Sequence, residues 1–255
     1  TLFNILKLKM PVIGLTATAS FQVLTNIKNE LLLNDDDVIY KMENRRDELN
    51  YSISLMEHNK TIKIKEDEDK YRTLKENINS YMSSDIMKSK YDAGLVFTMH
   101  VNGALGCCDL EKTLKTDLPE LKIGIYSGQQ PKFWVSEDKD DKSKAWDEYK
   151  RSIQQKYKNN DLNLMIATKS FGMGINKQNI RFSIHYGMPS SLESLYQEAG
   201  RCGRDGAKAE NLVIFSDPPE VAIPNYIFDP STPIEDKQEF RSKHRYVMSD
   251  MINQH

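Results

Sequence analysis

The segment from Leu164 to Gly206 constrains the fold more than any other part of the sequence. Leu162 to Ala167 is a short, almost wholly apolar run, which is typical of a strand buried on both faces of a parallel sheet. The chain then turns at Thr168 to Gly174, Ile180 to Tyr186 predicts a second strand, and the apolar spacing after Ser191 predicts a helix. Strands that alternate with helices in this way predict an α/β fold with a mainly parallel, doubly wound sheet.

Two features of this segment are chemically suggestive. Thr168, Lys169 and Ser170 precede a pair of glycines, and a turn of this kind offers amides and hydroxyls that can hold phosphate oxygens. Arg201 and Arg204 are three residues apart, so they share one helical face if the helix continues to them. The ordinary interpretation is a solvated basic helix end that complements the helix dipole, and the spacing by itself does not exclude it.

The exact residue sequence of this segment is more specific than the spacing of its apolar and charged residues. The run ATKSFGMGINKQNIRFSIHYGMP, followed by SLYQEAGRCGRDG, resembles motifs V and VI of the RecQ family of DNA helicases in superfamily two. The resemblance implies that Gln197, Arg201 and Arg204 face a nucleotide bound mostly by a partner domain, with Arg204 as the arginine finger. Cys202 departs from the family pattern, because a small residue is usual there.

The resemblance also implies which residues approach each ligand. The candidates for contacts with DNA phosphates are Thr168, Lys169 and Ser170, although the last two vary from the family's residues. The candidates on the nucleotide side are Asn176 and Gly174. The predicted fold becomes a RecA-like domain with helices on both faces of its sheet.

Two further DNA candidates follow other predicted strands. His100 comes after GLVFTM, at the place of the family's motif IV, although a histidine at a strand end is more often structural. Gly128 ends the strand at Lys122 to Tyr126, where the family usually has a loop that approaches DNA. Residues 131–142 look like extra loop, in which Trp134 either stacks on a base or, as we expect, anchors the loop to its own domain.

The sequence GLTATAS, at residues 14–20, resembles motif III of the same family. The resemblance implies that Thr16, Ala17 and Thr18 couple nucleotide state to DNA binding at the end of a first RecA-like domain. The chain contains no G-x-x-x-x-G-K-[ST] phosphate loop and no DEAH-like acidic box. We therefore expect a chain that is inactive alone, with ATP and Mg²⁺ held mainly by a first domain outside this sequence.

Three regions are expected along the chain. Residues 1–44 would close the first RecA-like domain and lead through a polar linker, residues 45–217 would form the second RecA-like domain, and residues 218–255 would form a proline-containing strap and a C-terminal helix. The chain does not begin with Met, which indicates a fragment. The partners implied are single-stranded and duplex DNA and the first RecA-like domain.

Composition narrows the class of protein. The 255 residues are 28% charged and 39% apolar with a net charge of −2, so any nucleic-acid site must be a local basic patch. Three cysteines are too few for a zinc site or a disulfide framework, which predicts no metal site and a reduced intracellular setting, nuclear in a eukaryote or cytoplasmic in a bacterium. No apolar run approaches the roughly 18 residues of a membrane span.

Two rival functions remain open at this point. Gly172 and Gly174 suggest a dinucleotide-binding oxidoreductase, but that fingerprint needs a third glycine where Lys177 stands and a helix rather than a strand afterwards. The second rival is a helicase-like domain that binds nucleic acid or a protein partner without catalysis. The missing hydrolytic half leaves this rival open.

Overall fold

The computed structural model describes residues 13–14, 21–39, 46–56, 63–103, 106–132, 134, 142–172, 175–216 and 233. Four candidate residues of the sequence analysis lie outside these ranges: Thr16, Ala17, Thr18 and Gly174. The other candidate residues lie within them.

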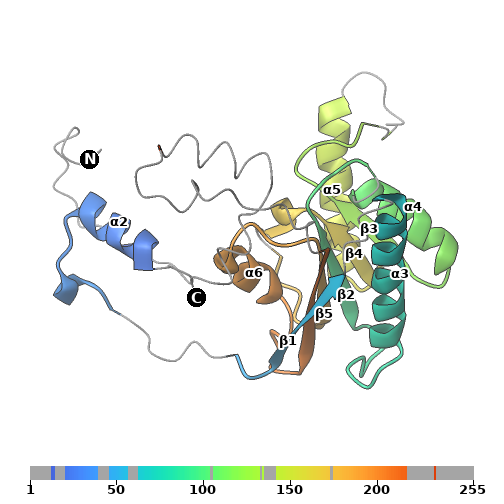
Figure 1. Ribbon diagram of the computed structural model, residues 1–255, viewed down its shortest axis with the longest axis horizontal. Helices are drawn as coiled ribbons and strands as arrows, with labels where there is room; N and C mark the ends of the chain where they lie inside the picture. Colours follow the sequence, from blue (N-terminus) through green and yellow to red (C-terminus); the bar gives the residue numbers. More distant parts are fainter. Residues whose placement is uncertain are drawn as a thin grey trace.

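Six parallel strands form one sheet in the described part of the chain (Figure 1). In chain order they are β1 (Leu49–Met56), β2 (Ala93–Thr98), β3 (Ile123–Tyr126), β4 (Leu164–Ala167), β5 (Ile180–Tyr186) and β6 (Ala209–Ser216). Their order across the sheet is β1-β6-β5-β2-β4-β3, so the chain crosses over repeatedly between parallel neighbours. This topology confirms the predicted doubly wound α/β fold.

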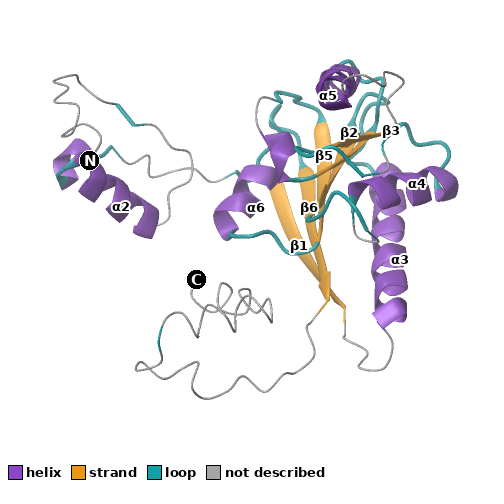
Figure 2. Cartoon of the chain, turned by 90° about the horizontal axis from the view of Figure 1, so that it is seen from above, coloured by secondary structure: helices purple, strands orange, loops and turns teal. Residues whose placement is uncertain are grey.

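Helices cover both faces of the sheet, as Figure 2 shows for α3 and α4 on one side and α6 on the other. The helical elements are α2 (Phe21–Leu31), η1 (Asp35–Asp37), α3 (Lys63–Met82), α4 (Cys107–Asp117), α5 (Lys142–Lys158), η2 (Lys169–Gly172) and α6 (Leu192–Ala199). One buried core lies beneath α3 and α4, and a second lies on the opposite face. Helix α5 contributes Trp146 to the first core, and Ile153 and Tyr157 to the second.

The central strands are buried along their whole length. Every residue of β2 and of β5 is buried, as expected of central strands in a parallel sheet covered on both faces. Gly94 of β2 leaves room for the ring of Phe182, because a Cβ at residue 94 would lie 2.0 Å from Phe182 Cζ. β5 also buries Arg181 and His185, and these two polar side chains reach partners in the segment from α6 to β6.

Several element boundaries differ from the sequence-based expectation. The sequence pattern predicts strands from Val38 to Lys41 and from Tyr51 to Met56, but β1 begins at Leu49, and the described residues Val38 and Ile39 form no strand. The apolar spacing after Glu66 predicts a helix that extends to about Lys90, but α3 ends at Met82. There Ser84 Oγ donates to the carbonyl of Tyr81 at 2.8 Å, a local bond that competes with helical continuation. The sheet spans residues 49–216, within the predicted second domain, while the domain boundaries themselves stay a prediction.

Candidate nucleotide and nucleic-acid sites

The two motif VI arginines lie in a turn after α6, not on a helix. α6 ends at Ala199, and Gly203 adopts φ +58, a left-handed conformation that favours glycine and that a helix cannot contain. The prediction that Arg201 and Arg204 share one helical face is therefore wrong. Arg201 is buried and Arg204 is exposed. The ordinary interpretation of a solvated basic helix end consequently fails for Arg201.

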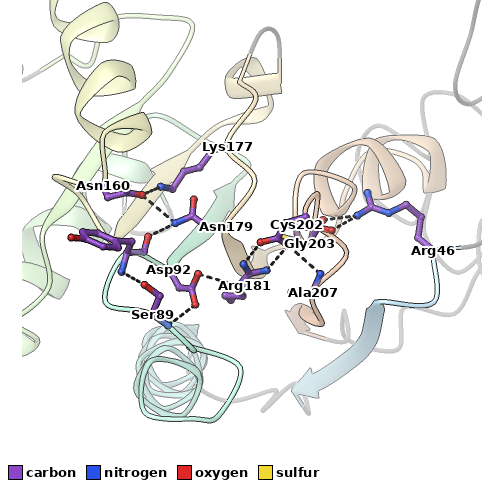
Figure 3. A network of polar contacts seen from close by, with 12 residues as sticks. Arg46, Ser89, Asp92, Asn160, Lys177, Asn179, Arg181, Cys202, Gly203 and Ala207 are labelled. Atoms are coloured by element: carbon purple, nitrogen blue, oxygen red, sulfur yellow. Dashed lines mark hydrogen bonds and ion pairs between the residues drawn. The ribbon is translucent and has the colours of Figure 1, made fainter.

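The segment before β1 holds this turn from one side (Figure 3). The Arg46 guanidinium donates hydrogen bonds to the carbonyls of Gly200, Cys202 and Gly203 at 3.0, 2.9 and 3.0 Å. Its Nε also pairs with the Glu48 carboxylate. Sequence reasoning missed Arg46, because no local pattern signals contacts with residues more than 150 positions away.

A chain of ion pairs holds the turn from β5. Arg181 Nη1 lies 2.9 Å from Asp205 Oδ1, a second pair joins Nη2 to Oδ2, and Nε lies 3.1 Å from Asp92 Oδ1. The Arg181 hydrogen bond, with help from the amide of Ala207, holds the pKa of Asp205 down at about 2. Arg181 was missed as well, although a charged residue in a predicted buried strand is a signal that could have found it.

Arg204 lies in the turn between the residues that Arg46 contacts and the one that Arg181 contacts. Its Nη1 donates to the carbonyl of Ile175 at 3.1 Å and to Asn176 Oδ1 at 3.4 Å, and its Nε to the carbonyl of Gly200 at 3.4 Å. The structure thus brings together Arg204 and Asn176, two candidates that lie 28 positions apart. These described bonds all end on neutral acceptors, so the positive charge of the side chain is available to an anion.

Arg201 lies near Arg204 but is more buried. Burial, and then the like charge of Arg204, lower the pKa of its guanidinium. Its Nε is buried and makes no hydrogen bond to the described residues. A buried guanidinium donor without a partner is costly, and an anionic phosphate oxygen is a ligand that would satisfy it.

The neighbouring residues of α6 differ in exposure. Gln197 is exposed on the helix, whereas Glu198 is buried. Glu198 Oε2 lies 3.1 Å from Nε2 of the buried His185, without the alignment of a hydrogen bond, and the imidazole stacks on the ring of Phe97. The contact ties α6 to β5, which places Gln197 on the outer side of a fixed helix.

The DNA candidates gather at the carboxyl edge of three adjacent strands. Thr168, Lys169 and Ser170 follow β4, Gly128 follows β3 and His100 follows β2. Thr168 Oγ1 lies 2.7 Å from Ser170 Oγ, and a Cβ on Gly128 would meet the Ser170 side chain at 3.1 Å. Lys169, His100 and Gly128 are exposed, Ser170 is half-buried and Thr168 is buried. The structure therefore places all five residues along one edge.

The two groups of candidates lie at opposite edges of the sheet. Gly203 N donates to the carbonyl of Ile180, the first residue of β5, and Asp205 contacts Arg181, the second. Because the strands are parallel, the arginine turn is at the amino edge, whereas Lys169 is at the carboxyl edge. Ile175 and Asn176, which precede β5, contact Arg204 of the arginine turn, whereas η2 follows β4 at the carboxyl edge.

Comparison with known protein families covers both the turn after β4 and the turn that bears the two arginines. Residues 69–206, which include both turns, match the family described as helicase conserved C-terminal domain. The chain belongs to this family. The predicted family resemblance is confirmed, and the dinucleotide-binding rival is excluded by the same match.

The chain is also similar to curated DNA helicases that include RecQ proteins. The chain is 28% identical to the ATP-dependent DNA helicase RecQ of Bacillus subtilis over 247 residues, which cover 97% of the chain and 35% of that protein. It is 47% identical over 70 residues, 28% of the chain, to the ATP-dependent DNA helicase RecQ of Haemophilus influenzae. The chain therefore spans about a third of the length of the Bacillus subtilis relative.

A solved structure supports the fold of the helicase domain. S. cerevisiae Dbp5 bound to RNA and ADP BeF3 is similar over 79% of this chain and 44% of that chain, with a TM-score of 0.52 and 15% sequence identity. At this identity the likeness concerns the RecA-like fold alone.

Three further observations concern the predicted loop anchor, metal ions and membranes. Trp134 packs against Trp146 and Tyr149, with ring centroids 5.2 and 5.7 Å apart, so it anchors its loop to α5 as expected. Within the described ranges, no group of three or more His, Cys, Asp or Glu side chains could hold a metal ion. Over the same ranges, no helix is long and apolar enough to cross a membrane.

Proposed function

We propose that the chain is the second RecA-like domain of an ATP-dependent DNA helicase of RecQ type, and that it supplies an arginine finger and DNA-backbone contacts. The observation that carries the proposal is the meeting of Arg204 with Asn176, which joins motifs V and VI beside an exposed, positively charged side chain. A first RecA-like domain would complete the site across a cleft.

The nucleotide side follows from the arginine turn. Arg204 reaches the γ-phosphate when the cleft closes, Arg201 offers its buried Nε to a second phosphate oxygen, and Gln197 and Asn176 orient the approach. ATP with Mg²⁺, held mainly by the first domain, supplies the phosphoryl group whose transfer to water drives the cycle. This chain contributes positioned charge, which is the main catalytic requirement of phosphoryl transfer.

The DNA side follows from the carboxyl edge. Lys169 supplies charge, the paired hydroxyls of Thr168 and Ser170 supply hydrogen bonds, and His100 and Gly128 flank them on neighbouring strands. Contacts of this kind position the nucleic-acid backbone and carry no base sequence. Opening and closing of the cleft would then move single-stranded DNA past this edge. Work on DNA would place the protein inside the cell, in the nucleus of a eukaryote or the cytoplasm of a bacterium.

A fluorescence anisotropy titration with labelled single-stranded DNA tests the DNA side on this chain. We expect weak binding without sequence preference, because phosphate contacts dominate affinity and few cations line the edge. Lys169→Ala should weaken binding and reduce the slope of log K against log salt by about 0.7, the value for one phosphate contact. Lys122→Ala is the matched control, since Lys122 is exposed at the opposite edge, immediately before β3.

Two results would contradict the proposal. Tight, sequence-selective binding at physiological salt would indicate base readout rather than backbone contact. Equal effects of Lys169→Ala and Lys122→Ala would remove the carboxyl edge as the DNA surface. If the protein joined to its first domain binds DNA but hydrolyses no ATP with or without DNA, a non-catalytic nucleic-acid-binding module is the better description.

A further inference from the structure

The Arg46 side chain spans the distance between the start of β1 and the turn that bears Arg204. Its three bonds to turn carbonyls are 2.9 to 3.0 Å long and use both terminal nitrogens, while Nε pairs with Glu48. Figure 3 shows the bonds from Arg46 to Cys202 and Gly203. The side chain is only 34% exposed. A planar guanidinium with donors in a fixed fork can hold several acceptors at once, which the single ammonium of lysine cannot do in the same geometry.

Arg46 and Arg204 meet at one atom. The Gly200 carbonyl accepts a hydrogen bond from Arg46 Nη1 at 3.0 Å and another from Arg204 Nε at 3.4 Å. A carbonyl oxygen has two lone pairs, so it can serve both donors. The position of Arg204 is thus linked, through a single peptide group, to Arg46, three residues before β1.

The backbone around Arg46 is fixed in turn. Leu49 N donates to the carbonyl of Arg46 at 3.1 Å, and Ala209 N donates to the carbonyl of Glu48 at 2.9 Å, at the beginning of the β1–β6 pairing. Gly203 is close to the same segment, because a Cβ there would meet Glu48 Cγ at 3.3 Å. The start of β1, the start of β6 and the arginine turn therefore form one packed unit.

We propose that Arg46 is a positioning residue for Arg204, tying the entry into β1 to the arginine turn. The inference rests on the proposed function, in which the chain before Arg46 leads from the first RecA-like domain and Arg204 acts on the nucleotide. A displacement of the entering chain reaches Arg204 through the carbonyls that Arg46 holds. Arg46 itself touches no substrate, and it acts through the orientation of Arg204.

The first test uses this chain alone and reads the turn directly. Amide hydrogen exchange should be about tenfold faster at Cys202 and Gly203 in Arg46→Ala, because the turn loses three bonds to its carbonyls. Exchange in β2 should change much less. Arg72→Ala is the matched control, since Arg72 is an exposed arginine of α3. Unchanged exchange in the turn would overturn the inference, and Arg46→Lys, which keeps the charge near Glu48, replaces the alanine variant if that variant does not fold.

The second test is a double-mutant cycle in the protein that carries both RecA-like domains. Arg46→Ala should lower kcat by about 10- to 100-fold with less than a twofold change in the KM for ATP, and Arg46→Lys should restore little of it. In the Arg204→Ala background, Arg46→Ala should have no further effect, because both act through one group.

The outcomes separate this inference from the proposed function. If Arg204→Ala abolishes turnover while Arg46→Ala keeps kcat within twofold, the inference is wrong and the proposed function stands. Additive losses in the double variant would also overturn it, since Arg46 would then act by another route. If Arg204→Ala leaves turnover intact, the proposed function fails whatever Arg46 does, and the exchange measurement still decides whether Arg46 holds the turn.

Discussion

Arg181 and Asp205 form a two-point ion pair that closes the arginine turn against the second residue of β5, with Nη1 and Oδ1 2.9 Å apart. The Arg181 side chain is 6% exposed and its other partner, Asp92, is 3% exposed, whereas Asp205 is 30% exposed. The guanidinium therefore bridges a buried carboxylate and a partly solvated one. Its loss would leave the buried carboxylate without its cation.

We expect Arg181→Met to lower the free energy of unfolding by about 3–5 kcal/mol, the cost of breaking a buried ion pair from one side. Asp205→Asn should cost about 1–2 kcal/mol, because it keeps the shape and loses the charge at a partly solvated site. Urea unfolding of this chain measures both. The control is Arg72→Met, whose pairs with Asp69 and Glu76 are exposed and should matter by less than about 1 kcal/mol. Equal costs for Arg181→Met and Arg72→Met would contradict the prediction.

The same ion pair predicts that the stability of the folded chain falls at acidic pH. The pKa of Asp205 is about 2 in the folded chain, below the ordinary value of 3.8. The unfolded chain therefore binds the proton more readily, and stability due to this group is complete above about pH 4 and is lost as pH falls toward 2. The wild-type chain should lose on the order of 2 kcal/mol more than Asp205→Asn over this window. Parallel stability curves for the two proteins, from urea unfolding at several pH values, would show that the pair does not depress the pKa.

Local sequence patterns predicted these strands well because β2 and β4 are nearly continuous apolar runs and β5 is rich in apolar residues between two turns. β5 was predicted with the observed boundaries, and β2 and β4 were predicted within one or two residues. The contacts of Arg46 and Arg181 were beyond such reasoning, because they join segments whose proximity depends on the strand order β1-β6-β5. Sequence spacing contains no information about which strands become neighbours.

The arginine turn shows a different kind of limit. Three-residue spacing predicted one helical face for Arg201 and Arg204, but the glycines at 200, 203 and 206 recur with the same spacing and allow a turn. Gly203 and Gly206 both adopt positive φ, which a helix cannot contain. The three glycines therefore predict a turn more strongly than the spacing of the two arginines predicts a helix. By contrast, the edge that carries Lys169 and His100 could be predicted, because parallel strands bring their carboxyl ends together.

Lys177 is expected to make stability rise with pH. Burial lowers the pKa of its ammonium to about 8 from 10.5, although Asn160 accepts a hydrogen bond from it and the Tyr157 ring lies beneath it at 5.0 Å. Between pH 8 and 10.5 the unfolded chain holds the proton and the folded chain releases it. The contribution of this group therefore increases with pH, by at most about 1.4 kcal/mol per unit.

Cys202 lowers stability as pH rises in this range, since burial raises its pKa to about 12. The test is therefore the difference in free energy of unfolding between wild type and each lysine variant. Urea unfolding at pH 7.5, 8.5 and 9.5 should show that Lys177→Met loses the upward contribution, while Lys122→Met, at an exposed position, keeps it. A constant difference in free energy between wild type and Lys177→Met at all three pH values would refute the lowered pKa.

The sharpest prediction concerns Arg204 in the protein that carries both RecA-like domains. Arg204→Ala should reduce turnover about 10³-fold, toward the lower end of the range for arginine fingers, because Arg201 and Gln197 remain nearby. Arg204→Lys should be almost as damaging. An arginine can direct Nη2 to a phosphate while Nε and Nη1 keep their bonds to Gly200 and Ile175, whereas a lysine has a single nitrogen for all of these partners.

Affinity for ATP should fall much less than turnover, since the first domain would hold most of the ground-state contacts. DNA affinity should hardly change, because Arg204 lies at the opposite edge of the sheet from Lys169. Steady-state ATP hydrolysis, with nucleotide and DNA binding measured separately, checks all three quantities. Lys169→Ala is the matched comparison, with DNA affinity reduced and nucleotide affinity retained. Turnover within a few-fold of wild type in Arg204→Ala, or a parallel decline of ATP affinity and turnover, would show that Arg204 is not the finger, and the exposed arginine would then be an ordinary surface charge on a well-held turn.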